Sequence, residues 1–394
     1  MGEVLVERCL EESLADLERH WASAQTFAYV HEKSAAAAPW LRGIPEQLPP
    51  SYRADHFCLL TSGTTGAPKL VIGCKQNSEE LARVLHRAQD SEPVRETIVS
   101  LPLTYCYAFV NQWLWSRVMH RKLVLTPGFA KPELFRHALR RANDAMLCLV
   151  GPQVALLRNM FGGERFPGVI RLHFAGGRFP QEQLPALREL FPNAAIFNNY
   201  GCAEALPRLT LRRSEDGDLA SDIGCPLPGV QLKSGEAGEL LFLSQYRCVA
   251  QLDSHGFRPI APDEWIPNGD LVREGSDGHW HLLGRAGEVF KRYGEKIALP
   301  QVLSTVNGQW HGQVGCYREK DGAGEDGYVL VLSPQPTSEN LRGLLQAFRS
   351  SHPRSHWPLR IECAAVLPLH PNGKVDSLAV QSMGNRSQLW RQRI

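Results

Sequence analysis

The sequence of 394 residues predicts an α/β protein with a large N-terminal domain, built on a layered α/β sheet and a small β subdomain, and a small, mobile α+β C-terminal domain. Up to Gly224, short apolar runs alternate with amphipathic ones, which is the pattern of strands and helices that pack in layers. Beyond Gly224 the strand-like runs are short and are separated by Gly and Pro turns, as in a β subdomain. We place the domain boundary at Gly284–Gly287, which predicts domains at 1–283 and 284–394.

The individual elements follow from the spacing of the apolar residues. Residues 4–22 show a helical period with one apolar face, and residues 35–50, rich in Ala and Pro, are expected to form a loop. Strands are expected at 56–60, 97–103, 123–126, 148–151, 169–175, 195–198, 238–243, 327–332 and 360–366. Helices are expected at 78–89, with Asn77 or Ser78 as the cap, and at 131–143, 181–190 and 338–351.

The composition limits the classes of function. A formal charge of +2 gives no electrostatic reason to expect nucleic acid or a membrane surface as a partner. The ten cysteines are scattered without a C-x-x-C pair, so we expect reduced core residues instead of a disulfide frame or a zinc site. No apolar run reaches the ~18 residues of a membrane span, and the N-terminus lacks a signal-peptide pattern, so the expected location is cytoplasmic. The sequence leaves the oligomeric state open, a homo-oligomer included.

A segment rich in Thr, Ser and Gly follows the strand-like run 56–60. It comprises Thr61, Ser62, Gly63, Thr64, Thr65, Gly66 and, two residues later, Lys69. Glycines let a backbone approach a polyphosphate closely, hydroxyl and N–H groups donate to phosphate oxygens, and a lysine adds a mobile positive charge. The segment is not a Walker A loop, because it lacks a Gly-Lys pair followed by Ser or Thr, so a P-loop NTPase is a distant alternative. A plain turn is the structural alternative.

Three further segments follow in a fixed order: Asn198–Glu204 (NNYGCAE), Asn268–Leu271 (NGDL) with Gly284–Gly294, and Leu367–Asp376 (LPLHPNGKVD). Together with the Thr/Ser/Gly segment they resemble the adenylate-forming superfamily of acyl- and aryl-CoA ligases, nonribosomal peptide synthetase adenylation domains and firefly luciferase. The resemblance runs from about Asp55 to Asp376. It implies that ATP and Mg²⁺ activate a carboxylic acid as acyl-AMP with release of pyrophosphate. The acyl group then passes to a thiol of CoA or of the phosphopantetheine arm of an acyl or peptidyl carrier protein.

The resemblance also implies a nucleotide site. The matching ATP- and AMP-binding positions are Thr61, Ser62, Gly63, Thr64, Thr65, Gly66, Lys69, Gly176, Gly177, Asn198, Tyr200, Gly201, Asp270 and Arg285. Tyr200 would stack on adenine, and Asn198 would hydrogen-bond the adenine amine. Glu204 would hold Mg²⁺, a cation that prefers oxygen ligands. Asp270 would accept both ribose hydroxyls, and Arg285 would reach the ribose or a phosphate. Taken alone, such residues are usually ordinary core or surface residues.

Lys374 is the expected catalytic residue, together with Glu204. The acid and the α-phosphate are both anionic, so a cation placed between them lowers their repulsion and stabilises the transition state. The preceding Pro-Asn-Gly makes a turn that can present Lys374, although such a lysine is often only an exposed turn residue. The resemblance implies a hinge at Gly287, and glycine has the backbone freedom that a hinge needs. Lys291 and Gly294 match the loop that faces the acceptor thiol in the family.

The segment Leu101–Phe109 indicates which class of carboxylic acid is the expected substrate. It has no carboxylate that could pair with the ammonium group of an α-amino acid, and an unpaired buried ammonium is costly. It resembles the aryl and acyl ligases, in which Tyr105 would be the gate, Tyr107 would hydrogen-bond a ring substituent and Gly176 would border the acyl group. A buried strand with aromatic packing is the structural alternative. An aromatic acid is therefore favoured over an amino acid.

The chain departs from the family at several places. Ala203 stands where the family usually has Thr, Ser377 where it has Arg, and Gly287 where it has Asp or Lys. The segment before the Thr/Ser/Gly loop is much shorter than usual, so part of the acyl pocket wall is expected to be missing or replaced. These departures favour a second hypothesis, a catalytically weakened nucleotide- or partner-binding member of the same fold. The intact motif acids and the terminal lysine speak against it.

Overall fold

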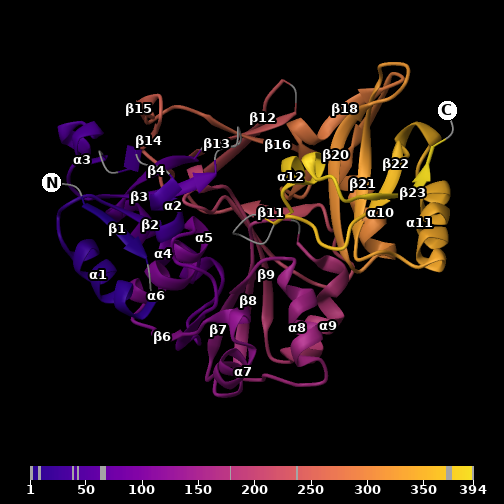
Figure 1. Ribbon diagram of the computed structural model, residues 1–394. Helices are drawn as coiled ribbons and strands as arrows, with labels where there is room; N and C mark the ends of the chain where they lie inside the picture. The colour runs from indigo at the N-terminus through magenta and orange to yellow at the C-terminus, as the bar shows by residue number, and fades with distance from the viewer. Residues whose placement is uncertain are drawn as a thin grey trace. The chain divides into compact units, whose positions relative to one another are not determined.

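The computed structural model describes residues 3–7, 10–37, 40–41, 44–62, 68–177, 179–236, 238–369 and 375–392 (Figure 1). The chain divides into two compact units. The first comprises Met1–Asn268 and Arg273–Leu282, and the second comprises Gly269–Val272 and Leu283–Ile394. Each unit combines sheets with helices, so the predicted α/β class is confirmed. Within the described ranges, no helix has the length and apolar character that crossing a membrane requires.

A six-stranded sheet carries the N-terminal part of the first unit, in the order β1-β2-β3-β4-β14-β15. Its strands are β1 (Glu3–Glu7), β2 (Phe27–His31), β3 (His56–Ser62), β4 (Pro68–Cys74), β14 (Ala250–Asp253) and β15 (Gly256–Pro259). Strands β1, β2 and β3 are parallel, whereas β3 and β4 are antiparallel, with Thr61 opposite Lys69. Apolar side chains of this sheet, such as Ala28 and Ile72, form one buried cluster. The predicted phosphate-binding segment therefore joins the ends of two hydrogen-bonded strands.

An eleven-stranded sheet follows the order β12-β13-β16-β17-β11-β10-β9-β8-β7-β5-β6. Its strands are β5 (Glu96–Val99), β6 (Lys122–Leu125), β7 (Ala145–Leu149), β8 (Val169–Phe174), β9 (Ala195–Tyr200), β10 (Thr210–Arg213), β11 (Asp222–Pro226), β12 (Val230–Ser234), β13 (Glu239–Ser244), β16 (Ile266–Glu274) and β17 (Trp280–Arg285). Neighbouring strands from β6 to β9 are parallel, and β10 runs antiparallel to β9. Ligands of parallel sheets gather at the carboxyl ends of the strands, where Gly176 follows β8 and Gly201 follows β9.

Helices supply the crossovers between these parallel strands. The helices of the first unit are α1 (Leu10–Ala22), α2 (Glu32–Ala37), α3 (Ile44–Gln47), α4 (Lys75–Ala88), α5 (Cys106–Ala108), α6 (Trp115–Val118), α7 (Pro132–Arg140), α8 (Gln153–Phe161) and α9 (Leu184–Leu190), and a π-helical stretch, Phe109–Leu114, joins α5 to α6. Figure 1 shows α7, α8 and α9 beside β7 to β9. Phe135, Leu157 and Leu187 of these helices share one core with Leu147 and Leu172 of the strands. Each such buried side chain stabilises the fold by about 1.5–3 kcal/mol.

The second unit is built on a four-stranded sheet in the order β20-β21-β22-β23 and a hairpin, β18-β19. Its elements are β18 (Val289–Arg292), β19 (Glu295–Ala298), α10 (Leu299–Gln309), β20 (Gln313–Lys320), β21 (Asp326–Ser333), α11 (Ser338–Ser351), β22 (Arg360–Cys363), α12 (Ser377–Ser382) and β23 (Ser387–Arg391). Helix α11 has the predicted bounds, because Thr337 and Asn340 form a reciprocal capping box at its start. Leu344 and Phe348 of α11 pack with Val302 of α10 in the core of this unit.

Two predictions for the N-terminal region were wrong. The predicted helix at 4–22 begins instead as strand β1, and only Leu10–Ala22 is helical. Leu5 is paired with Tyr29 of β2, a partner that the local helical period could not reveal. The predicted loop at 35–50 contains the end of α2 and the short helix α3. Tertiary pairing outweighed the local pattern in the first case.

Several element boundaries also differ from the prediction; for example, the strand expected at 148–151 is β7, Ala145–Leu149, and the helix expected at 131–143 is α7, Pro132–Arg140. Helix α4 begins at Lys75, and its N-cap, Cys74, makes no side-chain cap, so Asn77 and Ser78 do not cap it. The side chain of Asn77 instead donates to the carbonyl oxygen of Gln245. Strands β5 and β22 end earlier than predicted, at residues 99 and 363. Residues 106–118 are helical, which also overturns the alternative of a buried strand around Tyr105.

Candidate active site

Lys69 and Glu204, from two separate motifs, form an ion pair. Lys69 lies on β4, and Glu204 lies in a 3₁₀ turn, Ala203–Ala205, that follows β9. Nζ of Lys69 and Oε1 of Glu204 are 2.6 Å apart, and the two side chains are only 19% and 15% exposed. Burial raises the pKa of the Glu204 carboxyl, but the hydrogen bond and charge of Lys69 outweigh it, so the pKa is lower than usual. Glu204 is therefore an ionised oxygen donor beside a cation.

The predicted phosphate-binding residues divide into two groups. Thr61, Ser62 and Lys69 lie on the paired ends of β3 and β4. Gly63, Thr64, Thr65 and Gly66 lie outside the described residues. The flanks of the motif are thus held by a strand pair, and Lys69 connects this pair to the motif that contains Glu204.

Gly201 is required by a close approach of two backbone segments. A Cβ atom at this position would lie 1.9 Å from the carbonyl oxygen of Pro207 and 2.7 Å from its carbonyl carbon. The chain turns back here because Leu206 adopts a left-handed conformation, with φ of 50°. This tight loop follows Tyr200 directly and contains Glu204, so it fixes the position of one motif residue relative to the other.

Tyr200 is anchored through its hydroxyl group. The side-chain amide of Asn268, which is 6% exposed, donates to the Tyr200 oxygen at 2.6 Å. The Tyr200 side chain is partly exposed. A ring held at its polar tip can offer a face to a planar ligand, which is the property that the predicted adenine contact needs. The contact itself stays a prediction.

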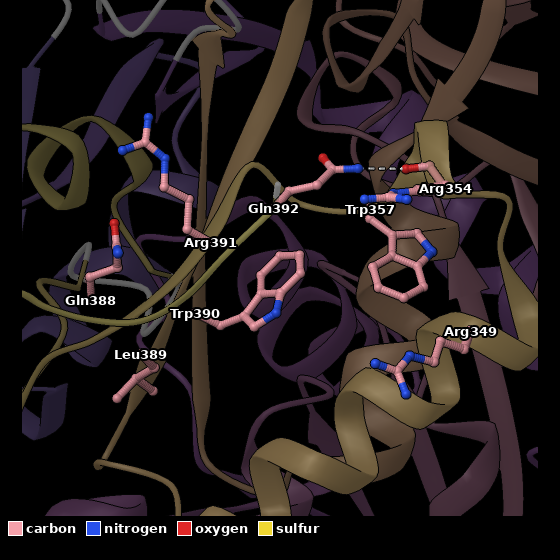
Figure 2. A pocket seen from close by; sticks show the side chains of 8 residues that line it. All are labelled: Arg349, Arg354, Trp357, Gln388, Leu389, Trp390, Arg391 and Gln392. Carbon is pink, nitrogen blue, oxygen red and sulfur yellow. Dashed lines mark hydrogen bonds between the residues drawn. The ribbon is translucent and has the colours of Figure 1, made fainter. Parts of the chain in front are cut away.

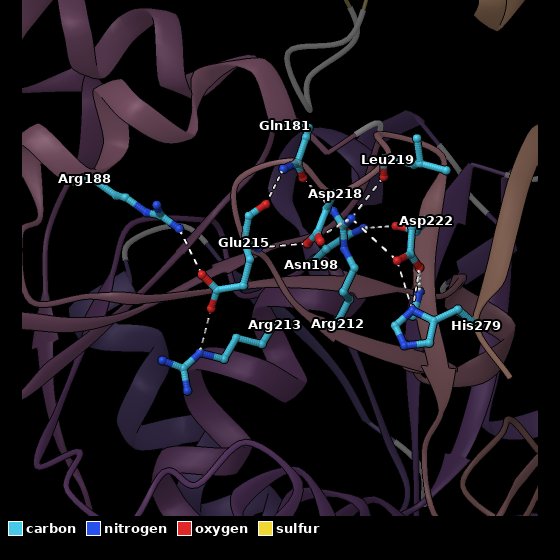
Figure 3. Close-up of polar contacts among 11 residues, drawn as sticks. Gln181, Arg188, Asn198, Arg212, Arg213, Glu215, Asp218, Leu219, Asp222 and His279 are labelled. Atoms are coloured by element: carbon cyan, nitrogen blue, oxygen red, sulfur yellow. Dashed lines mark hydrogen bonds and ion pairs between the residues drawn. The ribbon is translucent and has the colours of Figure 1, made fainter. Parts of the chain in front are cut away.

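Asn198 belongs to a polar network around Asp222 (Figure 3). Its amide nitrogen Nδ2 donates to the main-chain oxygen of Asp222 at 3.2 Å. The Asp222 carboxylate lies 2.9 Å from Nδ1 of His279 and 3.8 Å from Nη1 of Arg212. Because Nδ2 of Asn198 is used within the protein, a hydrogen bond from an adenine amine would go to its Oδ1 atom.

The two glycines after β8 have different physical reasons to be glycine. Gly176 has φ of 77°, in the left-handed region, and a Cβ atom there would lie 3.5 Å from Cγ1 of Val150. Gly177 has no such conformation, and its Cβ would meet nothing within 4 Å. Gly176 is therefore explained by its backbone, which side chains disfavour. Gly177 borders open space, as a close approach of ligand and backbone would require.

The two predicted acyl-pocket tyrosines lie at the start of α5. Tyr105 is the residue before the helix and is partly exposed. Burial, and then the charge of Glu7, raise the pKa of Tyr105. The hydroxyl of Tyr107 donates to the main-chain oxygen of His173 at 2.9 Å. The proton of Tyr107 is thus used by the backbone, and its hydroxyl group also interacts with the side chains of Asn199 and Cys148.

Sequence analysis missed a buried polar cluster beside Tyr107, which we define as Tyr107, Asn111, His173, Asn199 and Arg208. Arg208 donates through Nη1 to Oδ1 of Asn111, and Nδ2 of Asn199 lies 3.4 Å from Nδ1 of His173. Four of the five side chains are at most 2% exposed, and Tyr107 is partly exposed. Asn199 lay inside a recognised motif, but nothing in the sequence distinguished Arg208 from an ordinary surface arginine.

Asp270 and Arg285 lie in the second unit and pair with each other. Nε of Arg285 is 3.0 Å from Oδ1 of Asp270, and the Arg285 side chain is 52% exposed whereas that of Asp270 is 9% exposed. The acid is therefore held in place by the core, and the arginine reaches it from the surface. Their predicted contacts with the ribose stay predictions.

The other predicted residues of the second unit are spread along it. Gly287 lies in a 3₁₀ turn, 286–288, and Lys291 is exposed on β18. Tyr293 and Gly294 both have positive φ, 50° and 81°, and form the two-residue turn between β18 and β19. Such a turn favours glycine, which explains Gly294 without any ligand. Lys374 lies outside the described residues.

Figure 2 shows a surface hollow of the second unit whose lining includes none of the predicted site residues. It has a volume of about 990 Å³ and is lined by residues that include Arg349, Arg354, Arg391, Trp357 and Trp390. The two tryptophan rings have their centroids 6.1 Å apart. The hollow has cationic and aromatic walls but shares no residue with the motifs.

The predicted role of Glu204 as a magnesium ligand can be compared with its surroundings. Among the residues that the structure describes, no group of three or more His, Cys, Asp or Glu side chains could hold a metal. Mg²⁺ is commonly bound by one or two carboxylates together with substrate phosphates. The ionised and largely buried Glu204 fits that kind of shared site, in which ATP would supply further oxygen ligands.

Known proteins resemble the chain in sequence. The family model of the AMP-binding enzymes matches residues 6–240. A non-ribosomal peptide synthetase of Streptomyces venezuelae is 24% identical over 345 residues, covering 83% of this chain and 34% of the synthetase. The 2-hydroxy-7-methoxy-5-methyl-1-naphthoate–CoA ligase of Streptomyces carzinostaticus is 25% identical over 353 residues, covering 83% of this chain and 62% of the ligase. The chain thus spans less than two thirds of the length of these two relatives.

Solved structures share the fold. The o-succinylbenzoate CoA synthetase of Bacillus subtilis, solved with an acyl-adenylate intermediate, superposes with a TM-score of 0.74 at 17% identity. The match covers 98% of this chain and 89% of the synthetase. At this identity the likeness shows the fold alone. Because the family model matches more than half of the sequence, the chain belongs to the AMP-binding enzymes, the adenylate-forming superfamily that its motifs predicted.

Proposed function

We propose that the protein activates a carboxylic acid with ATP as an acyl-adenylate and then transfers the acyl group to a thiol. One observation carries the proposal most directly: Lys69, next to the phosphate-binding segment, is held 2.6 Å from Glu204 of the second motif. In an AMP-binding enzyme this pair suits a cation for the phosphates and a carboxylate for their metal ion. A plain turn after β3 would have no reason to bury such a pair.

In the first step, a carboxylate oxygen of the acid bonds to the α-phosphorus of ATP, and the bond from that phosphorus to pyrophosphate breaks. Lys69 would bind the departing phosphates, and Lys374 would lie between the two reacting anions and lower their repulsion. Glu204 would hold Mg²⁺, which, when bound, adds positive charge to the phosphates. Tyr200 and Asn198 would orient the adenine, and Asp270 would orient the ribose.

In the second step, a thiolate bonds to the acyl carbon, and the bond from that carbon to the AMP oxygen breaks. Lys291 and Gly294 would face the incoming thiol, after a pivot of the second unit near Gly287. The thiol belongs to CoA or to a carrier protein. Relatives support both, since one is named a CoA ligase and another a non-ribosomal peptide synthetase.

We infer an aromatic acid as the substrate. The segment from Leu101 to Val110 offers no carboxylate for an amino acid's ammonium group, and Tyr105 and Tyr107 supply aromatic surface. One relative is named for a naphthoate and one fold neighbour for anthranilate. The peptide synthetase relative keeps an amino-acid substrate as the alternative.

Exchange of labelled pyrophosphate into ATP tests the proposal, with a panel of benzoates, cinnamates, fatty acids and proteinogenic amino acids. We expect exchange that depends on the acid, with an aromatic acid ahead of every amino acid. Lys374→Ala should lower exchange by about 10²-fold, the scale of lost electrostatic stabilisation, while ATP binding persists. Lys320→Ala, an exposed lysine of the same unit, is the control and should exchange normally.

The proposal would be wrong if exchange took place without any acid. It would also be wrong if no acid of the panel supported exchange. In the second case ATP binding without exchange would support a weakened binding protein. A clear preference for an amino acid would show that residues 101–110 do not form the acyl pocket.

A further inference from the structure

Arg208 is a buried cation without a counter-charge among the described residues. Its side chain is fully buried, and it makes one side-chain hydrogen bond, from Nη1 to Asn111. Its Nε and Nη2 atoms have no hydrogen-bond partner within the described part of the chain. The groups that act on it electrostatically are the hydroxyl of Tyr107 and the thiol of Cys148, neither of them a carboxylate. A guanidinium has five N–H donors, so most of its capacity is unused.

Two other buried arginines, Arg212 and Arg292, pair with carboxylates, whereas the buried Arg121 and Arg247 each donate to several neutral acceptors. Arg212 lies 3.4 Å from a carboxylate oxygen of Asp218, and Arg292 lies 3.4 Å from one of Asp321. Burial lowers the pKa of Arg208 to about 10, so it remains a cation at neutral pH. Burying an unpaired charge costs free energy, and an anion that binds beside the charge offsets part of this cost. Arg208 thus differs from these arginines, because both its Nε and its Nη2 lack a partner among the described residues, whereas each of the others lacks one only at Nε.

The surroundings of Arg208 place it beside the proposed acyl pocket. It follows the tight loop that carries Glu204, and the donor Tyr107 is a predicted pocket residue. His173 of the same cluster precedes Gly176 at the end of β8, and its Nε2 atom also lacks a partner among the described residues. Tyr107 is the partly exposed member of the cluster, and its hydroxyl is one of the groups that act electrostatically on Arg208.

We propose that Arg208 determines substrate specificity: the acid that is activated carries a second carboxylate, which binds Nε and Nη2 of Arg208 within the buried polar cluster. The planar fork of a guanidinium matches a carboxylate with two parallel hydrogen bonds. His173 Nε2 would be a further donor to this carboxylate. This inference rests on the proposed function and refines its aromatic acid to an aromatic dicarboxylic acid.

The test compares each diacid with its own monomethyl ester, which keeps the shape and removes one charge. Phthalic, isophthalic, terephthalic and homologous acids are assayed by pyrophosphate exchange with wild type, Arg208→Met and Arg208→Gln. In wild type, kcat/KM for the best diacid should exceed that for its monoester by about tenfold or more, the value of a charged hydrogen bond. In both variants this ratio should fall to about one, mostly through the diacid.

A second measurement does not depend on catalysis. The diacid should raise the thermal unfolding midpoint of wild type but not of Arg208→Met, with ATP absent. Met fills the same space without a charge, so this variant should fold. Arg213→Met, which changes an exposed arginine of β10, is a control in which the response to the diacid persists. The inference is wrong if wild type activates monoacids but prefers the monoester to the diacid. It is also wrong if the Arg208 variants keep the preference for the diacid. Either result leaves the proposed function intact. If no acid supports exchange, the proposed function fails, and the thermal shift alone decides whether Arg208 binds a dicarboxylate.

Discussion

Replacing each of three glycines of the candidate site with Ala should change the stability of the protein by a different amount. In Gly201→Ala the new Cβ would lie 1.9 Å from the oxygen of Pro207 and 3.0 Å from Cα of Arg208, whereas real Cβ contacts are not shorter than 3.0 Å. The obstructing atoms belong to the backbone, so the loop has to move by about 1 Å, and overpacking of this kind costs about 3 kcal/mol. The same movement displaces Tyr200 and Glu204.

Gly176→Ala and Gly177→Ala are the matched comparisons. At Gly176 the φ of 77° costs an L-residue about 1–2 kcal/mol, partly offset by the lower entropy of the unfolded chain. At Gly177 the methyl group meets nothing within 4 Å, so stability should change by less than about 0.5 kcal/mol. If a ligand approaches this backbone, Gly177→Ala weakens ATP or acid binding while the protein stays stable.

Urea unfolding of the three variants and wild type, followed by ATP titration, separates these effects. The predicted order of destabilisation is Gly201→Ala, then Gly176→Ala, then Gly177→Ala. A Gly201→Ala protein as stable as wild type would refute the reasoning from the Pro207 contact. A Gly177→Ala protein that is stable and binds both ligands normally would remove Gly177 from the site.

Three further predictions concern a charge, a helix cap and a hinge. Because the pKa of Glu204 lies below its ordinary value of 4.5, the Glu204–Lys69 pair should stabilise the fold above that pH and lose this effect as the pH falls. The difference in unfolding free energy between wild type and Glu204→Gln should therefore vanish in acid. A difference that does not depend on pH would contradict this prediction. Thr337→Ala should cost about 1 kcal/mol in urea unfolding through loss of the cap of α11, whereas Ser338→Ala, an exposed neighbour outside the cap, should change stability little; equal effects would argue against the capping box. Gly287→Pro should slow transfer of the acyl group from preformed acyl-AMP to a thiol more than it slows pyrophosphate exchange, and equal losses would place the pivot elsewhere.

The sequence predicted those parts of the fold whose causes are local. Helix α11 was placed correctly because Thr337 and Asn340 cap it from within the same turn. Short apolar runs predict the strands β7, β8 and β9, because a parallel sheet buries its strands on both faces. Strand β1 was missed because its pairing partner, β2, lies about twenty residues away and leaves no mark on the local period.

The candidate site was predictable to the extent that it lies in motifs. Lys69 and Glu204 were singled out separately, and the structure brings them together as an ion pair. Arg208 could not be found in this way, because no motif contains it and its unusual feature is the absence of hydrogen-bond partners for Nε and Nη2 among the described residues. Only burial and unfilled hydrogen bonds distinguish it from the many arginines that lie on protein surfaces.

The transfer of an oxygen atom tests the central claim most directly. An acid labelled with oxygen-18 in its carboxylate is incubated with ATP, Mg²⁺ and the acceptor thiol, and the nucleotide product is analysed by mass spectrometry. If the carboxylate attacks the α-phosphorus and the thiol then breaks the acyl–oxygen bond, the account predicts AMP that carries one labelled oxygen from each activated acid. Label in inorganic phosphate with formation of ADP, or AMP without label, would contradict activation through an acyl-adenylate.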